Sequence, residues 1–442
     1  MKRTIFNQLI AWQQSVTRKP LILLGARQVG KTFILKHFGA TAYLNSIYIN
    51  FEDNPSYRRL FEASLEPEAI LRALSLELNI AISPKDTLII FDEIQECPNA
   101  LNSLKYFCEQ ANQYHIAAAG SLLGVKLKNT KGFPVGKVDF LDLYPMSFSE
   151  FLIALDQTRL VDFLHEIQTL DPIPSNLHDK FIEYFKTYLF IGGMPEAVAQ
   201  FVQTGDIQTC RKIHQDIIRA YQLDFAKHAP ADIVMKINQV WDSIPSQLAK
   251  ENKKFIYSVL RTGARARDFE TAIQWLLEAG LIAKVYNIET PKMPLEAYKN
   301  FEIFKIYLVD VGLLGAKTLL PANVIVHGNE VFEEFKGSYV ENYVATTLAR
   351  LQYSLFYWTS AGTAEVDFIL QNDGDIYPLE IKSGLSTKKK SLLVYADKYR
   401  PKLVVRSSPM NLKQDGAMLN IPLYLLDELP HLLARSLNKL RQ

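Results

Sequence analysis

A glycine-bounded loop at residues 25–32 constrains this chain more than any other feature of its sequence. The loop follows the apolar run 20–24, which is typical of a buried strand, and precedes 33–38, which can form a helix. In a strand, loop and helix so arranged, backbone N–H groups and the positive end of the helix dipole point at one volume. Lys31 would reach the β- and γ-phosphates, and the Thr32 hydroxyl would ligate Mg²⁺. The pattern GxxxxGK[ST] therefore predicts a site for ATP, in which every residue of the loop takes part: Gly25, Ala26, Arg27, Gln28, Val29, Gly30, Lys31 and Thr32.

A second apolar run, at 87–91, ends in two acidic residues, Asp92 and Glu93. Its β-branched composition is typical of a strand buried on both faces of a parallel sheet. Ligands bind at the carboxyl edge of such a sheet, so the acids should lie beside the phosphate loop. We expect Asp92 to hold Mg²⁺ through water and Glu93 to orient or deprotonate the attacking water. The alternative is a solvated strand end.

Length and composition are those of a folded protein with several domains. The chain has 442 residues, of which 48% are hydrophobic and 22% charged, and this length predicts two to four domains. The net charge is +2, from 49 basic and 47 acidic residues, so any contact with DNA must come from local patches. The three cysteines show no metal-binding spacing, and no run approaches 18 apolar residues. We expect a soluble, cytoplasmic protein.

The first 150 residues alternate short apolar runs with longer amphipathic stretches, which predicts a parallel α/β sheet. The expected strands are 20–24, 46–51, 87–91, 115–119 and 138–143, and the expected helices are 5–18, 66–80 and 99–112. From 151 to 230 the apolar spacing becomes helical, as in a lid or connector. A Gly-Gly-Met-Pro sequence at 192–195 ends one helix there and starts the next.

Residues 231–300 have the pattern of a winged helix. Helices are expected at 232–241, from 243 onward, at 253–260 and at 268–279, followed by strands at 281–287 and 303–309. In such a module the third helix can enter the major groove of DNA, and here Arg265 and Arg267 precede it. The alternative is a lid or a protein-docking module.

The region 301–442 carries a second set of chemically suggestive residues. Strands are expected at 353–358, 364–371, 376–382 and 402–406, with helices at 331–351 and 388–398. Glu380 and Lys382 are two residues apart and should share one face of a strand, within reach of Asp367. Two carboxylates could ligate Mg²⁺ or Mn²⁺, Lys382 could stabilise the charge that develops on a phosphodiester, and Glu341 could complete the metal shell. The alternatives are cross-strand ion pairing and a nuclease fold that no longer cuts.

Over nearly its whole length the chain resembles a family of bacterial and archaeal AAA+-type ATPases. In this family a P-loop domain is joined to a C-terminal restriction-endonuclease-like domain of unassigned function. The matching segments are GARQVGKT at 25–32, LIIFDEIQ at 88–95, AAAGSLLG at 117–124, YPMSFSEFL at 144–152, FIGGMPEAV at 190–198, FKIYLVDVGLL at 304–314, EVDFIL at 365–370 and PLEIKSG at 378–384. The Walker motifs are shared by many unrelated ATPases, whereas GGMPEAV, DVGLL and LEIKSG together are far more specific.

The resemblance implies further roles. Ser121 falls where such ATPases place a polar residue that senses the γ-phosphate; a simple strand-ending turn is the alternative. Many relatives have Gly-Arg where this chain has Gly-Lys at 136–137, and Lys137 lacks the planar fork of an arginine finger. The C-terminal segment looks like the PD-(D/E)xK nucleases, in particular archaeal Holliday-junction resolvases. Asp367, Glu380 and Lys382 match that motif, although Val366 replaces its proline.

These observations predict a multidomain α/β fold with a P-loop ATPase domain at 1–150, a helical connector at 151–230, a winged-helix-like module at 231–300 and a nuclease-like domain at 301–442. Two functions remain open. The chain is either a Mg²⁺-dependent ATPase that acts on nucleic acid, with a C-terminal domain that binds DNA and whose ability to cut it is left open, or a nucleotide-dependent switch or stress or defence sensor with an inactive docking domain. Its oligomeric state is open, since AAA+ domains often act as rings. Positive charge near the proposed metal site favours DNA, although a solvated face is the alternative: Lys382, Lys388, Lys389, Lys390, Lys398, Arg400 and Lys402.

Overall fold

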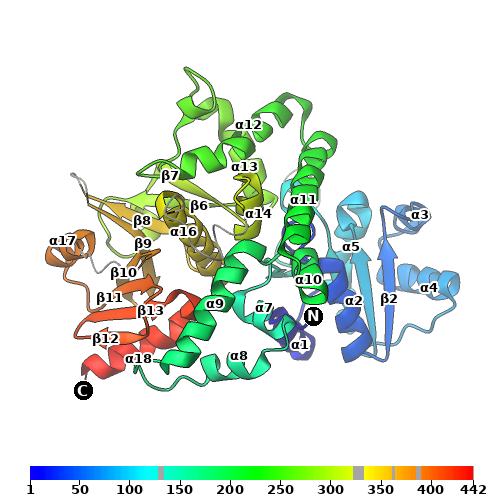
Figure 1. Cartoon of the computed structure of the whole chain (residues 1–442). Coiled ribbons are helices and arrows are strands. Elements are labelled where there is room, and N and C mark those ends of the chain that lie inside the picture. The colour runs from blue at the N-terminus through cyan, green and yellow to red at the C-terminus, as the bar shows by residue number, and fades with distance from the viewer. Residues whose placement is uncertain (128–133, 322–332, 361–363, 385–389, 442) are drawn as a thin grey trace. The chain divides into compact units, whose positions relative to one another are not determined.

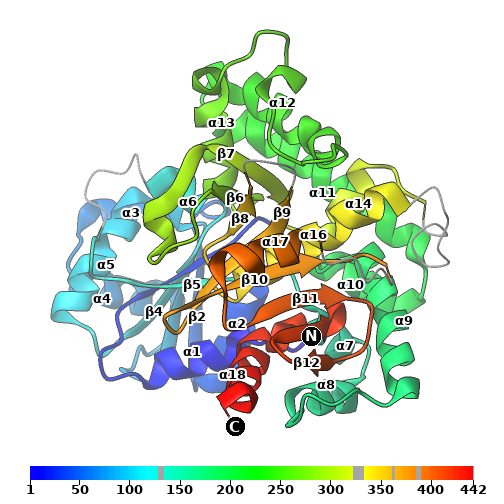
Figure 2. The same ribbon diagram turned by 90° about the vertical axis from the view of Figure 1, so that its left-hand side faces the viewer.

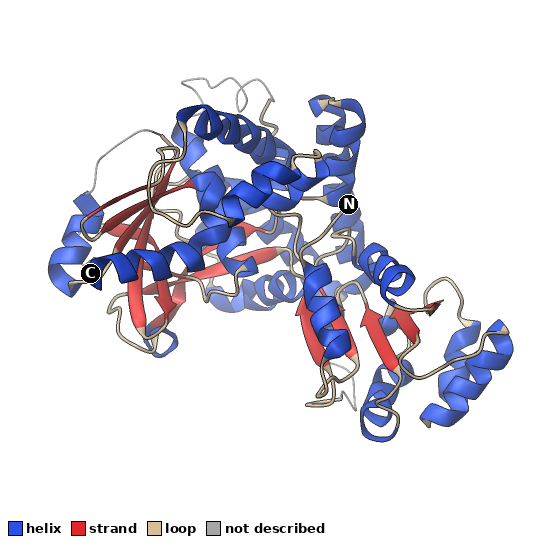
Figure 3. Ribbon diagram, turned by 90° about the horizontal axis from the view of Figure 1, so that it is seen from below, coloured by secondary structure: helices blue, strands red, loops and turns tan. Residues whose placement is uncertain are grey.

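The computed structural model describes residues 1–127, 134–321, 333–360, 364–384 and 390–441. The chain forms two compact units (Figure 1). The first comprises Met1–Tyr144 with Glu278–Leu281, and the second comprises Pro145–Leu277 with Ile282–Gln442. Each unit contains one of the two sheets into which the strands gather in Figure 3.

The first unit is built on five parallel strands in the order β2-β3-β4-β1-β5. Their bounds are β1 Leu21–Leu24, β2 Asn45–Asn50, β3 Thr87–Asp92, β4 His115–Ala119 and β5 Asp139–Asp142. All five expected strands are therefore confirmed to within a residue or two. β4 lies between β1 and β3, so the loops that follow these three strands come out side by side at one edge of the sheet.

Helices cover both faces of this sheet because its strands are apolar on both sides. The helices are α1 Ile5–Gln14, α2 Lys31–Ala42, α3 Ser56–Ala63, α4 Pro67–Leu78, the short 3₁₀ helix Ile94–Glu96, α5 Pro98–Gln110 and α6 Leu123–Leu127. Ile47, Ile89 and Ile116 pack in one core with Leu104 and other residues of α3, α4 and α5. Residues of the opposite parity face the other way, where Leu88 lies against α2. Burial on both faces fixes the register, because a slip of one residue would exchange the two faces.

Helices make up much of the second unit. These are α7 Phe148–Ala154, α8 Thr158–His165, α9 Ser175–Ile191, α10 Pro195–Thr204, α11 Ile207–His228, α12 Ala231–Leu248, α13 Ala266–Glu278, α14 Val311–Lys317 and α16 Glu333–Arg350. The start of α7 is a capping box, since the Ser147 side chain accepts from the Glu150 N–H and the Glu150 carboxylate accepts from the Ser147 N–H. The helical connector expected from 151 is thus confirmed as helical.

The sheet of the second unit has eight strands in the order β12-β13-β11-β10-β9-β8-β6-β7. The strands are β6 Ile282–Ile288, β7 Lys299–Leu308, β8 Phe356–Thr359, β9 Glu365–Asn372, β10 Asp375–Ile381, β11 Val404–Ser408, β12 Lys413–Asp415 and β13 Met418–Pro422. β11 pairs parallel with both β13 and β10, and β6 pairs parallel with β8, whereas the other neighbouring strands pair antiparallel, so the sheet is mixed. α17 Lys390–Tyr399 lies against β9 and β10 (Figure 2), and α18 Leu429–Arg441 ends the described chain. The mixed α/β class expected for the C-terminal region is confirmed.

Residues 231–300 differ in detail from the helices that the sequence predicts. The run expected to break near 243 is one continuous helix, α12, with Pro245 close to its end. Ile237, Trp241, Ile244 and Leu248 are all buried at helical spacing, and this continuous stripe outweighs one missing backbone hydrogen bond. The helix predicted at 253–260 is wrong, since only the 3₁₀ turn Tyr257–Val259 forms there.

The β-ribbon expected for a winged helix forms, but it belongs to the large sheet. β6 and β7 pair antiparallel, and β6 also pairs with β8 through Tyr286–Phe356 and Ile288–Trp358. β7 crosses the boundary expected at residue 300. The ribbon is therefore continuous with the strands of the C-terminal region.

Three of the segments that carry the family resemblance meet at one buried point of the second unit. The Gly193 N–H donates to Asp310 Oδ2 at 2.6 Å, and the Gly193 carbonyl accepts from the Met146 N–H at 2.7 Å. A Cβ on Gly193 would lie 2.1 Å from the Met146 carbonyl oxygen, so only glycine fits here. Asp310 also caps α14 by accepting from the Leu313 N–H at 3.0 Å. In the segments 144–152, 190–198 and 304–314, the residues Met146, Gly193 and Asp310 are therefore required by close packing and hydrogen bonding to one another.

None of the helices within the described ranges combines the length and the apolar character needed to cross a bilayer.

Candidate functional site

The loop between β1 and α2 is held in a conformation that ordinary residues seldom adopt. Gly25 has a φ of 144°, Gln28 of 67° and Gly30 of 96°. A Cβ on Gly25 would lie 2.2 Å from the carbonyl oxygen of Leu143, so glycine is required at this close approach. α2 then begins at Lys31. The strand, loop and helix predicted from the sequence are all confirmed.

Lys31 is buried at the start of α2, with its side chain folded back over the loop. Its ammonium donates to the carbonyls of Gly25 and Ala26, both at 2.8 Å. Burial lowers the pKa of Lys31 to about 8, against the opposing influence of the nearby carboxylates of Glu93 and Asp92. Lys31 is thus mostly charged at neutral pH, in a buried position where that charge favours an anionic ligand.

Asp92, at the end of β3, joins the phosphate loop to the edge strand β2. Its Oδ2 accepts from the Thr32 hydroxyl at 2.7 Å and from the Tyr48 hydroxyl at 2.8 Å. Its Oδ1 accepts from the Glu93 N–H at 3.1 Å. The Lys36 ammonium lies 3.5 Å from the centroid of the Tyr48 ring. The expected proximity of Thr32 and Asp92 is therefore present, and Tyr48 is a member of the site that the sequence reasoning missed.

Glu93 is held by hydrogen bonds from two neighbouring segments. Its Oε2 accepts from the Ser121 N–H at 3.0 Å, from the Ser121 hydroxyl at 2.8 Å and from the Gln95 side-chain amide. Burial raises the pKa of Glu93, but the bonds from Gln95 and Ser121 outweigh burial and leave the pKa below its ordinary value. Glu93 is therefore ionised at neutral pH. Gln95 was also missed, although it stands within the segment 88–95.

Lys137 lies near the amino-terminal ends of the strands of the same sheet, whereas the phosphate loop follows their carboxyl-terminal ends. Asp139, two residues later, pairs with Leu21 at the start of β1, whereas the phosphate loop follows Leu24 at its end. The Lys137 ammonium is 2.9 Å from Glu109 of α5, and both side chains are well exposed. Lys137 therefore cannot reach the phosphate loop of its own chain.

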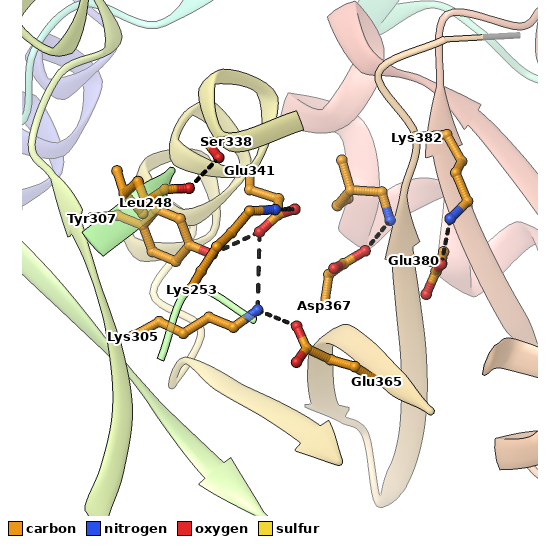
Figure 4. Close-up of polar contacts among 11 residues, drawn as sticks. Leu248, Lys253, Lys305, Tyr307, Ser338, Glu341, Glu365, Asp367, Glu380 and Lys382 are labelled. Carbon is orange, nitrogen blue, oxygen red and sulfur yellow. Dashed lines mark hydrogen bonds and ion pairs between the residues drawn. The ribbon is translucent and has the colours of Figure 1, made fainter. Parts of the chain in front are cut away.

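The expected C-terminal residues come together in the second unit (Figure 4). The Lys382 ammonium is 2.5 Å from Glu380 Oε1, which confirms that the two side chains share one face. Asp367 Oδ2, on the neighbouring strand β9, accepts from the Ile381 N–H at 2.7 Å. Glu380 Oε2 is buried and has no hydrogen-bond partner in the described part of the chain.

Glu341 projects from α16 toward the same strands but is already paired (Figure 4). Its Oε1 accepts from the Lys253 ammonium, and its Oε2 accepts from the Tyr307 hydroxyl at 2.8 Å. The fully buried Lys305 ammonium lies 3.9 Å from Glu341 Oε2 and 2.5 Å from Glu365 Oε1. The sequence reasoning found Glu341 but missed both of these lysines and the tyrosine.

The charges of this cluster act strongly on one another. Burial, together with the nearby carboxylates of Glu341 and Glu380, holds the pKa of Asp367 well above its ordinary value. Burial likewise raises the pKa of Glu380, against the opposing ammonium of Lys382. Burial would also raise the pKa of Glu341, but the ammonium groups of Lys253 and Lys305 outweigh it and lower that pKa. Asp367 and Glu380 are therefore the carboxylates that a further cation would stabilise most.

Within the residues that the structure describes, no group of three or more acidic, histidine or cysteine side chains is arranged to hold one metal ion. Both oxygens of Glu341 accept hydrogen bonds from groups of the chain itself. The three carboxylates expected in one metal shell are thus close together but divided into Asp367 with Glu380 on one side and Glu341 on the other.

The other basic residues of interest lie at the surface. Arg265 and Arg267, at the start of α13, are both exposed. Lys402 is exposed as well and pairs with Asp375 at 2.8 Å. Of the basic run predicted near the metal site, Lys388 and Lys389 lie outside the described residues. Exposed positive charge is therefore present at these positions, and at Lys402 it is partly neutralised by the pair with Asp375.

Comparisons with known proteins agree with the first of these two sites. Residues 17–152 match a family model described as an AAA domain. Residues 182–323 and 336–426 match two models of domains of unknown function, DUF8612 and DUF4143 respectively. A search of curated proteins found no match.

Several solved structures are similar to the chain. They include a Walker-type ATPase of Pyrococcus abyssi (15% identity, 72% of this chain and 95% of that chain covered, TM-score 0.45). The Orc1 protein of Aeropyrum pernix, solved in complex with DNA, follows at 14% identity (72% and 91% covered, TM-score 0.28). The RuvB Holliday junction branch migration motor of Thermotoga maritima has 14% identity (66% and 90% covered, TM-score 0.29). The glycine loop, the paired acids and the match to the AAA domain model together show that the chain carries a P-loop NTPase domain of the AAA type.

Proposed function

We propose that this protein is a Mg²⁺-dependent ATPase that acts on DNA. The observation that carries the proposal is the convergence of Lys31, Thr32, Asp92, Glu93 and Ser121 at one edge of the first sheet. These residues come from three different loops, and each has the chemistry that phosphoryl transfer to water requires.

The residues at this edge fit the nucleotide and its metal. The Thr32 hydroxyl and the Asp92 carboxylate are oxygen ligands at hydrogen-bond distance from each other, and Mg²⁺ prefers oxygen ligands. Lys31 brings a buried positive charge to the loop, whose glycines allow a phosphate to approach the backbone. When bound, Mg²⁺ would neutralise charge on the β- and γ-phosphates. Thr32 and Asp92 are the residues that would hold it.

The other residues of the site would act on the attacking water and on the leaving charge. Glu93 is ionised, so its carboxylate can accept a proton from water or orient it. Ser121 donates two hydrogen bonds to that carboxylate and thereby fixes its position. Lys31 would stabilise the negative charge that develops on the phosphate oxygens. Because Ser121 follows the central strand β4, a contact with the γ-phosphate would be transmitted directly to Glu93.

For the C-terminal unit, we propose that Asp367 and Glu380 bind Mg²⁺ or Mn²⁺ and that Lys382 faces a scissile phosphate of DNA. Three observations support the proposal: the two acids lie on adjacent strands, Glu380 Oε2 is buried without a partner, and Lys382 shares their face. Burial first, and then neighbouring carboxylates, raise the pKa of Asp367 and of Glu380, and a divalent cation would stabilise their ionised forms. Glu341 would complete the shell only after giving up its present partners.

The second candidate function is a nucleotide-dependent switch or stress sensor with an inactive docking domain. The saturation of Glu341 by Lys253 and Tyr307 favours it, because a carboxylate fully paired within the chain needs no metal. The response of ATP turnover to DNA, together with DNA cleavage, distinguishes the two functions.

ATP turnover by the purified full-length protein tests the proposal, measured alone and with branched or single-stranded DNA, with Mg²⁺ present throughout. We expect the wild type to hydrolyse ATP and DNA to change the rate. Lys31→Ala should be inactive with and without DNA, which would exclude a contaminating ATPase. Turnover that is insensitive to every DNA, together with no cleavage of any DNA, would support the switch instead.

A further inference from the structure

Lys253 reaches the carboxylate cluster from a loop that no sequence motif covers. The loop follows α12, and the Lys253 ammonium pairs with Glu341 Oε1 (Figure 4). The residue has a φ of 48°, in the left-handed region that residues other than glycine seldom adopt. A lysine in this conformation persists only where its surroundings determine it strongly. The backbone therefore holds Lys253 in a defined position, from which its ammonium pairs with Glu341.

The loop is fastened on both sides of Lys253. Before it, the Ser338 hydroxyl donates to the Leu248 carbonyl at 2.6 Å, which joins the end of α12 to α16 one turn before Glu341. After it, the Phe255 N–H donates to the Phe304 carbonyl of β7 at 2.9 Å. These anchors aim the lysine at Glu341 without burying it completely, since 16% of its side chain remains exposed.

The two lysines beside Glu341 differ in their freedom to move. Lys305 is fully buried, pairs with Glu365, and keeps its positive charge because Glu341 and Glu365 raise its pKa against the effect of burial. Lys253 lies on a loop and can turn toward solvent without unpacking the sheet. If Lys253 turned out, Glu341 Oε1 would become available on the side that faces Asp367 and Glu380.

We propose that the Lys253 ammonium occupies the place of a divalent cation at Glu341, so that Lys253 sets the affinity of the C-terminal site for metal. This inference rests on the metal site proposed above at Asp367 and Glu380. In one state Lys253 neutralises Glu341; in the other a metal ion takes over Glu341, and Lys253 turns to solvent. The two cations compete for one carboxylate, and removal of the lysine leaves a more negative cluster.

The test is a titration of the nucleotide-free, full-length protein with Mn²⁺, with bound ion followed by electron paramagnetic resonance. Lys253→Met keeps the length of the side chain and removes its charge. If about nine-tenths of the molecules hold the ion pair, its loss should tighten Mn²⁺ binding about tenfold. The matched control is Lys254→Met, one residue along the same loop, which should bind like the wild type. Lys253→Arg keeps the charge and should also bind no more tightly than the wild type.

Glu380→Gln, introduced into the wild type and into Lys253→Met, assigns the bound ion to this site. The affinity of an ion at the phosphate loop would not change with this substitution. Equal Mn²⁺ affinity in the wild type and in Lys253→Met, with Glu380→Gln weakening both, would overturn the role of Lys253 and leave the metal site standing. If Glu380→Gln changes nothing in either background, the metal site and the inference both fail.

A second measurement on the wild type does not depend on how well a variant folds. Lys253 should react faster with an acetylating reagent when Mn²⁺ is present, because the ion releases its ammonium from Glu341. Mass spectrometry of the labelled peptide reports this rate, with Lys254 as the internal control. A severalfold increase at Lys253 alone is expected, and an unchanged rate at saturating Mn²⁺ would overturn the competition.

Discussion

The pH dependence of ATP hydrolysis should report the hydrogen bonds that hold Glu93. Ser121→Ala removes the hydroxyl that donates to Glu93 Oε2 at 2.8 Å and leaves the backbone N–H at 3.0 Å in place. Gln95→Met removes the amide that donates to the same oxygen. Each of these bonds favours the ionised carboxylate, so the loss of either should raise the pKa of Glu93.

The size of the shift follows from the strength of such bonds. A hydrogen bond to a charged group contributes about 1.5–3 kcal/mol, and one pKa unit corresponds to about 1.4 kcal/mol. We therefore expect the acidic limb of the kcat profile to move up by about 1–2 pH units in each variant. The pKa of Glu93 in the wild type lies below the ordinary value of a glutamate, so the variants keep an ionised Glu93 at neutral pH and stay active there.

The assay is kcat for ATP against pH at saturating Mg²⁺, with Gln110→Met on the exposed end of α5 as the control. The titration of ATP itself is common to all four proteins and cancels in the comparison. Ser121→Ala should also lower the plateau if Ser121 contacts the γ-phosphate, whereas Gln95→Met should not. An acidic limb that stays in place in both variants, or moves to lower pH, would refute the assignment of Glu93 as the ionised base.

Three further outcomes are expected. Burial raises the pKa of Asp310 to about 6, so the contribution of Asp310 to the free energy of unfolding is complete below about pH 4 and falls by about 3 kcal/mol as the pH rises through 6. In urea unfolding at pH 4.5 and 7, Asp310→Asn should lack this pH-dependent loss of stability. Equal pH dependence in the wild type and the variant would contradict the raised pKa. Charge reversal at Arg265 and Arg267 should weaken DNA binding and reduce its salt slope by about two, measured by anisotropy; an unchanged slope would assign α13 to protein contacts. Lys382→Ala should keep Mn²⁺ binding and lose DNA cleavage, whereas Glu380→Ala should lose both, with ATP turnover preserved in each; cleavage by Lys382→Ala would disprove its role.

The first sheet could be predicted closely because its strands are short, apolar on both faces and separated by strong turn signals. The loop at 25–32 and the acids at 92–93 fix which edge of the sheet carries the chemistry, and the structure puts Thr32 and Asp92 in contact there. Local sequence was sufficient because each of these residues stands at the end of a strand or the start of a helix.

Except for the bond from Gln95 to Glu93, the contacts named above that sequence reasoning missed join segments far apart in the chain. Tyr48 reaches Asp92 from the neighbouring strand β2, 44 residues earlier, and Lys253 reaches Glu341 from a loop 88 residues earlier. Neither pairing leaves a periodic or spacing signal. The error at 253–260 has a similar cause, because the segment that looked helical instead fastens itself to β7 through Phe255. Tertiary contacts there override local helix propensity.

The assignment of Glu93 as the catalytic base carries the central claim of ATP hydrolysis. Glu93→Gln keeps the shape of the side chain and removes its charge, so the variant should bind ATP and turn it over at least about 100-fold more slowly. Lys31→Ala should lose binding as well as turnover, since it removes the ammonium that meets the phosphates. The most direct measurement is therefore ATP turnover of Glu93→Gln together with its equilibrium binding of radiolabelled ATP. Retained binding with lost turnover is the predicted result, and hydrolysis at the wild-type rate would contradict it.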